Sequence, residues 1–171
     1  ITAVGAGGDV VYSTDTIANV DVDSNWNQTE IWSNKVTGPN AGPPWVAANA
    51  FDGNIGTSAS PDAGAVMTFT PATPIPCTTS FSYYQRLSNP TGCTVTINGV
   101  AQAINSNLSG QRVTLNLPAG NQLVSLAWNR LNGSVSIDMG SILVDGKELV
   151  DSGIPGATVT GNTLTFPTSN N

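Results

Sequence analysis

Residues 122–139 read QLVSLAWNRLNGSVSIDM, and this stretch decides the fold class. Residues 122–128 are almost continuously apolar, which is typical of a strand in the middle of a sheet. Residues 134–139 alternate small polar with apolar side chains, the pattern of a half-buried strand. Asn132-Gly133, between them, tolerates the positive φ angles of a two-residue hairpin turn. The stretch therefore predicts a β-hairpin that contributes a central strand.

The same alternation extends outward along the chain. Residues 66–70, 94–97 and 112–117 are predicted strands. Asn98-Gly99 predicts a hairpin turn into residues 100–104, and Gly161-Asn162 predicts another between residues 157–160 and 163–166. Apolar residues at helical spacing are almost absent, and Pro71, Pro74 and Pro76 end the strand at Phe69.

These strands, separated by frequent turn signals, predict an all-β chain that folds as a single β-sandwich or jelly roll. The length of 171 residues suits one domain. We expect an extended N-terminal arm at residues 1–20, the β-sandwich at 21–167, and a polar tail at 168–171. The chain begins at Ile1, which suggests a processed product or a piece of a longer polypeptide.

The composition excludes several classes of function. Charged residues make up 9% of the chain, with 5 Lys and Arg against 11 Asp and Glu, so nucleic acid is not an expected partner. Apolar runs are too short to span a bilayer, which argues against membrane insertion. The sequence has no His and only 2 Cys, which removes the imidazole base, the Ser-His pair and the common zinc sites. We therefore do not expect an enzyme.

The segment Ala50-Phe51-Asp52-Gly53-Asn54-Ile55-Gly56-Thr57 resembles the A-x-D-G-x-x-x-T motif of galactose-binding-like (discoidin-type) β-sandwiches, which include many carbohydrate-binding modules. Together with residues 142–151, it is also similar to domains of structural and tail-fibre proteins of marine phages, cyanophages especially. The resemblance covers about residues 24–153. It implies a galactose-binding-like sandwich on a virion surface.

In discoidin-type modules this acidic turn often holds a structural Ca²⁺. The resemblance implies Asp52, Asn54 and Thr57 as its oxygen ligands, with Asp145 or Glu148 as a further candidate. The aromatic residue that commonly follows the Thr is absent, because Ser58 follows here. The alternative is an Asx-type turn in which the Asp52 carboxylate accepts backbone N–H groups. On that alternative the protein needs no cofactor.

Trp45 follows GPNAGPP, residues 38–44, a loop too rich in Pro and Gly to form a ladder. Its ring could stack on a sugar, anchor a contact with another subunit, or fold back as a lid on the core. Trp26, Trp32 and Trp128 lie in strand-like contexts and are expected in the core.

Tyr83 and Tyr84 are adjacent in a predicted strand, so one should be buried and the other exposed. The exposed one, with Arg86, could join a sugar or subunit contact, or form an ordinary sheet surface. Cys77 and Cys93 are expected to be free buried thiols rather than a disulfide.

Carboxylate pairs for glycoside hydrolysis, Asp138 with Glu148 or Asp145 with Asp151, have no support beyond chance, because carboxylates at turns such as Asp145-Gly146 are common.

We expect a structural protein domain of a phage virion surface or tail fibre, used in assembly and in attachment to a host-surface glycan. Its partners would be other virion proteins, including copies of itself, and the glycan. The alternatives are a purely structural capsid decoration protein and a carbohydrate-binding module of a secreted bacterial protein.

Overall fold

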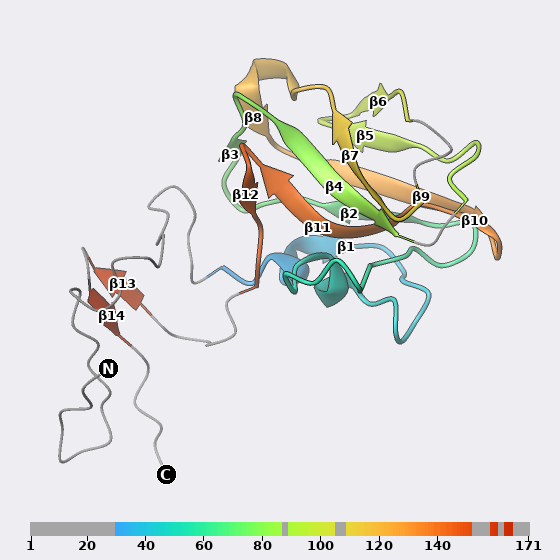
Figure 1. Ribbon diagram of the computed structural model, residues 1–171, viewed down its shortest axis with the longest axis horizontal. Coiled ribbons are helices and arrows are strands. Elements are labelled where there is room, and N and C mark those ends of the chain that lie inside the picture. Colours follow the sequence, from blue (N-terminus) through green and yellow to red (C-terminus); the bar gives the residue numbers. More distant parts are fainter. Residues whose placement is uncertain (1–29, 87–88, 105–108, 152–157, 161–162, 166–171) are drawn as a thin grey trace, which may run out of the picture. The chain divides into compact units, whose positions relative to one another are not determined.

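The computed structural model describes residues 30–86, 89–104, 109–151, 158–160 and 163–165. Contacts divide the chain into two compact units, of which the larger is Ile31–Val150 and the other combines Ile1–Glu30 with Asp151–Asn171. The larger unit is built of antiparallel strands, as predicted for an all-β sandwich (Figure 1). The predicted arm at residues 1–20, the tail at 168–171, the boundaries at 20 and 167, and Trp26 lie outside the described residues.

Two large sheets make up most of the larger unit (Figure 1). The six-stranded sheet has the order β1-β2-β9-β5-β6, with β10 also paired to β9; its strands are β1 (Val36–Thr37), β2 (Val66–Phe69), β5 (Val95–Ile97), β6 (Val100–Gln102), β9 (Leu126–Asn132) and β10 (Val135–Ser136). The four-stranded sheet has the order β12-β11-β4-β7, with β4 (Phe81–Arg86), β7 (Gln111–Leu115), β11 (Asp138–Val144) and β12 (Lys147–Glu148).

Short elements complete the fold. They are a two-stranded sheet of β3 (Ile75–Pro76) and β8 (Gln122–Leu123), and the 3-10 helices η2 (Trp32–Lys35), η3 (Ala47–Ala50) and η4 (Ala119–Asn121). In the second unit, β13 (Thr158–Thr160) pairs with β14 (Thr163–Thr165), which confirms the predicted hairpin. Its predicted turn at Gly161-Asn162 lies outside the described residues.

The core takes side chains from both large sheets. Alternation buries every second residue of a half-covered strand, and the fully buried side chains follow this rule in β2, β5, β7 and β9. The largest include Met67, Phe69, Trp128 and Leu126 from the six-stranded sheet and Phe81, Tyr83 and Met139 from the four-stranded sheet. Trp32 and Trp128 are buried, as predicted.

The predicted central strand at residues 122–128 is only partly correct. Residues 126–128 belong to β9, which does lie between β2 and β5, but residues 122–123 form β8 in another sheet. The Asn98 side chain causes the break. Its Oδ1 accepts hydrogen bonds from the N–H groups of Val124 and Ser125 at 2.8 and 3.0 Å, and its Nδ2 donates to the Gln122 carbonyl at 2.8 Å. The side chain therefore occupies backbone groups that a neighbouring strand would use.

Both hairpin connections predicted within the larger unit are present, one of them at a shifted position. Asn98 and Gly99 have φ angles of 51° and 79° and connect β5 to β6. Between β9 and β10 the connection falls one residue later than predicted, because Asn132 pairs with Val135 and leaves Gly133 and Ser134 as the linking residues. The predicted strand at residues 134–139 is then divided between β10 and β11, with a register shift after Val135.

Asp145 closes the turn between β11 and β12, as predicted for Asp145-Gly146. Its carboxylate accepts hydrogen bonds from the backbone N–H groups of Thr78, Thr79 and Ser80 at 2.8 to 3.0 Å. Burial raises the pKa of Asp145, but these hydrogen bonds together lower it well below the ordinary value. Asp145 therefore joins two loops of the fold.

Candidate functional site

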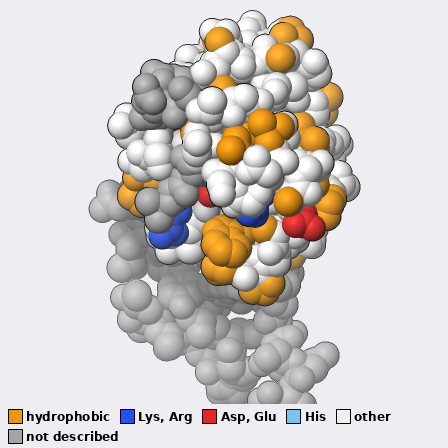
Figure 2. Space-filling view, turned by 90° about the vertical axis from the view of Figure 1, so that its right-hand side faces the viewer, with side chains coloured by type: hydrophobic (Ala, Val, Ile, Leu, Met, Phe, Trp, Pro, Cys, Tyr) orange, Lys and Arg blue, Asp and Glu red, His pale blue; other side chains and the backbone are white. Residues whose placement is uncertain are grey.

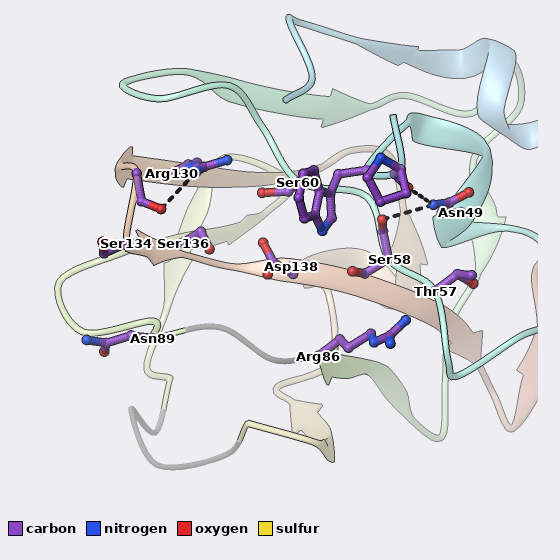
Figure 3. A pocket seen from close by; sticks show the side chains of 13 residues that line it. Asn49, Thr57, Ser58, Ser60, Arg86, Asn89, Arg130, Ser134, Ser136 and Asp138 are labelled. Atoms are coloured by element: carbon purple, nitrogen blue, oxygen red, sulfur yellow. Dashed lines mark hydrogen bonds between the residues drawn. The ribbon is translucent and has the colours of Figure 1, made fainter. Parts of the chain in front are cut away.

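A pocket of about 560 Å³ lies in the larger unit, where the end of β9, the beginning of β11 and the loops before β2 meet (Figure 3). Segments far apart in the sequence supply its walls: Pro44, Trp45, Asn49, Thr57, Ser58, Ser60, Arg86, Asn89, Arg130, Gly133, Ser134, Ser136 and Asp138. In Figure 3, Asp138 lies near the centre, between Arg130 on one side and Arg86 on the other. Hydroxyl, amide, charged and aromatic groups thus surround one cavity.

The loop holds the backbone of Trp45 in place, but much of its side chain remains exposed to solvent. Its N–H donates to the Gly42 carbonyl at 2.8 Å, and its carbonyl accepts from the Ser60 N–H at 3.2 Å. Asn49 Nδ2 donates to the Pro44 carbonyl. The side chain of Trp45 is 43% exposed and lines the pocket. Trp45 is therefore not enclosed in the core, and its predicted roles as a sugar platform, a subunit contact or a lid on the core stay open.

Asp138 is the deepest charged group of the pocket. Its side chain is 8% exposed, and its Oδ1 atom has no hydrogen-bond partner among the described residues. Burial, the largest effect, raises the pKa of Asp138, while the hydroxyls of Ser60 and Ser136 and the charges of Arg130 and Arg86 lower it, leaving the pKa above the ordinary value. Burying a carboxylate oxygen without a partner is unfavourable, which agrees with the raised pKa of this group.

The raised pKa of Asp138 predicts that this side chain costs stability at neutral pH. The native state binds the proton more tightly than the unfolded state, so this contribution to stability is favourable at low pH and is lost as the pH rises through the native pKa. Asp138→Asn should therefore raise the free energy of unfolding at pH 7 by about 0.5–1 kcal/mol. The gain should vanish near pH 3. Denaturant unfolding of both proteins across this pH range measures it.

A loss of stability for Asp138→Asn at pH 7 would show instead that the charge of Asp138 holds the fold together. Asp62→Asn is a matched control, because Asp62 is an exposed carboxylate that bonds only the adjacent Ala63 N–H among the described residues. It should leave the unfolding free energy within about 0.5 kcal/mol.

The two arginines of the pocket are held differently. Arg130 Nε and Nη2 donate to the carbonyls of Asn132 and Gly133 at 2.8 and 2.9 Å, which fixes its guanidinium at the turn after β9. The guanidinium of Arg86 donates no hydrogen bond within the described part of the chain. Arg86 stands opposite Asp138 in the pairing of β4 with β11, which is why both reach the same cavity.

Tyr83 is 1% exposed and belongs to the core, so the structure corrects its assignment as a contact residue. Tyr84 points to the other side of β4, as alternation requires, and is partly exposed. It does not line the pocket: its hydroxyl donates to the Gly110 carbonyl at 2.8 Å, and the Arg112 guanidinium lies over its ring at 5.9 Å. Of the four predicted contact residues, the pocket brings together Trp45 and Arg86.

The predicted metal ligands Asp52, Asn54 and Thr57 do lie together. The Asp52 carboxylate accepts from the Asn54 N–H at 2.9 Å and from the Thr57 hydroxyl at 2.6 Å, and the Thr57 hydroxyl lies 2.9 Å from the Asn54 carbonyl. Gly53 has a φ of 71°. This is the geometry of the Asx-type turn, the alternative that the sequence left open. No group of three or more His, Cys, Asp and Glu side chains gathers among the described residues.

Ca²⁺ at this turn stays a prediction. Asp145, a predicted additional ligand, is instead bonded to residues 78–80. Cys77 and Cys93 are free and buried, as predicted. Burial raises the pKa of Cys77 to about 11, so the thiol stays protonated at neutral pH.

The sequence did not predict the remaining polar residues of the pocket as a site; these are Arg130, Asp138, Asn89 and the serines. One signal was available: Asp138 is a charged residue inside a strand-like alternation, in a chain with only 9% charged residues. On the face that Figure 2 shows, few charged side chains are visible, and hydrophobic ones lie in separate groups among uncharged polar ones.

Comparisons with known proteins identify no relative: no family model, curated protein or solved structure matches this chain. Among the described residues, no helix is long and apolar enough to cross a membrane.

Proposed function

We propose that the unit Ile31–Val150 is a glycan-binding domain without catalytic activity. The observation that carries this proposal is the pocket that Trp45, with 43% of its surface exposed, lines together with the carboxyl group of Asp138 and several hydroxyl and amide side chains. A pyranose ring offers the matching groups, because it has an apolar face for the indole and hydroxyl groups that donate to a carboxylate.

The remaining lining supports a hydroxylated ligand. Ser58, Ser60, Ser136, Asn49 and Asn89 supply hydroxyl and amide groups that both donate and accept hydrogen bonds. A small number of directed polar groups around an aromatic surface is typical of ligand pockets.

The pocket does not support glycoside hydrolysis. That reaction commonly uses two carboxyl groups roughly 5–9.5 Å apart. Asp138 is the one carboxylate among the residues that line the pocket.

The setting of this binding follows from the resemblance rather than from the pocket. On a virion surface or tail fibre, many copies of one weak site would act together, and multivalency raises overall avidity by a factor on the order of 10²–10⁴. We therefore propose a structural domain of a virion that attaches to a glycan of the host surface, in contact with other virion proteins and copies of itself.

Titration of the ¹⁵N-labelled domain with a panel of glycans tests the proposal. At least one glycan should shift the indole N–H signal of Trp45 and the Nε–H signals of Arg86 and Arg130 saturably. The side-chain amide signal of Asn98 is an internal control. Asn98 follows Ile97, which pairs with Leu126 at the opposite end of β9 from Arg130. The Asn98 signal should therefore not shift.

Shifts confined to residues outside the pocket, or no saturable shift with any glycan, would overturn the proposal. The titration should be run in Ca²⁺ and again in EDTA. A dependence on Ca²⁺, accompanied by shifts at Asp52, Asn54 and Thr57, would assign a metal to that turn.

A further inference from the structure

The pocket concentrates positive charge in an acidic protein. The chain carries 5 Lys and Arg against 11 Asp and Glu, for a net charge of −6. Two of the five basic residues, Arg86 and Arg130, line the pocket, whereas a single acidic residue, Asp138, does so. Even with Asp138 ionised, these three side chains sum to one positive charge. The pocket therefore has the opposite sign to the chain as a whole.

Asp138 does not use the donors of these arginines. Its Oδ1 has no partner among the described residues, although both guanidiniums act on it electrostatically. Arg130 directs two of its donors to the carbonyls of Asn132 and Gly133. Arg86, with five N–H donors, directs none of them to a described residue. Its planar fork matches two oxygens of one anionic group.

We propose that the ligand of this pocket is an acidic saccharide, whose carboxylate or sulfate group pairs with the guanidinium of Arg86. This inference rests on the proposed glycan binding and adds the charge of the ligand to it. The positions of the groups support the pairing, because Arg86 points into the cavity from the end of β4, on the side of Thr57 and away from Arg130 (Figure 3).

Matched pairs of ligands test the inference by isothermal titration calorimetry. A uronic-acid oligosaccharide is compared with the same oligosaccharide after reduction of its carboxyl groups, and a sulfated oligosaccharide with its desulfated form. The acidic member of at least one pair should bind tenfold or more tightly. Its affinity should fall with added salt, since ion pairing at a solvent-accessible site is screened. The two pairs distinguish a carboxylate from a sulfate.

Variants of Arg86 locate the effect. Arg86→Gln should reduce the ratio of acidic to neutral affinity to near one, and Arg86→Lys, which keeps the charge but loses the fork, should give an intermediate ratio. Lys35→Gln is the matched control, because it removes one positive charge outside the lining residues. It should keep the wild-type ratio.

The outcomes separate the two proposals. Wild-type protein that binds neutral members as tightly as acidic ones overturns the acidic ligand and leaves glycan binding standing. The same holds if Lys35→Gln lowers the ratio as much as Arg86→Gln does. Absence of binding by every member of both pairs, together with no hit in the glycan panel, overturns both.

Discussion

Gly140→Ala should lower the free energy of unfolding by about 3 kcal/mol, the upper end of the cost of overpacking a buried site. A Cβ atom at Gly140 would lie 2.5 Å from the Thr57 carbonyl oxygen, 3.6 Å from its carbonyl carbon and 3.7 Å from Ser58 Cα. All three are backbone atoms, so no flexible side chain can move aside. Two hydrogen bonds between Ala59 and Met139, at 2.9 and 3.0 Å, also hold this segment against β11.

The same substitution should weaken ligand binding, because Thr57, Ser58 and Ser60 line the pocket and would move with the displaced segment. Urea unfolding measures the stability. Gly133→Ala is the control, since a Cβ there meets nothing within 4 Å, and it should change stability by less than about 0.5 kcal/mol. Equal stability of Gly140→Ala and wild type would mean that residues 57–60 yield without cost and do not form a rigid wall.

Trp45→Ala should reduce glycan affinity by about 30-fold or more, which corresponds to about 2 kcal/mol, the threshold for residues that dominate an interface. Trp45 is the one aromatic residue among the described lining of the pocket, so no other ring can replace its contact with a sugar face. The loop should remain in place, because its hydrogen bonds to Gly42 and Ser60 use the backbone of Trp45. Calorimetric titration with the tightest ligand of the panel measures the loss.

Leu117→Ala provides the comparison for Trp45→Ala. Leu117 is 41% exposed, close to the 43% of Trp45, but does not line the pocket. Its removal should leave affinity within about twofold of wild type. An unchanged affinity of Trp45→Ala would place the glycan elsewhere, and Trp45 would then remain a candidate for a contact between subunits.

Several parts of the fold could be predicted because they depend on neighbours in the chain. The alternation at residues 66–70 produces β2, and Asn98-Gly99 forms the expected turn, since φ preferences are local. The interruption of the predicted strand at Val124-Ser125, between β8 and β9, could not be predicted this way. It depends on the Asn98 side chain, which is distant in sequence and is brought there by the pairing of β5 with β9.

The site shows the same division. Trp45 and Arg86 were recognisable as candidates from their residue types and loop or strand contexts, but nothing local indicated that they share one cavity. Asp138 was recognisable only as a charge in a strand. Its partner position opposite Arg86 depends on the register of β4 and β11, which are separated by most of the chain's second half. Alternation predicted that one of Tyr83 and Tyr84 is buried, but only the packing of the sheet showed that it is Tyr83.

The sequence by itself determined that this chain is an all-β protein, that turns fall at Asn98-Gly99 and Asp145-Gly146, and that it lacks the imidazole chemistry of many enzymes. Those properties follow from residue type and from periodicity over a few positions. Only the tertiary structure decided which tyrosine is buried, which strand is interrupted, and which polar groups meet beside Trp45. Strand register and loop packing bring together residues that are far apart in the chain, and those long-range contacts depend on how the whole core is filled.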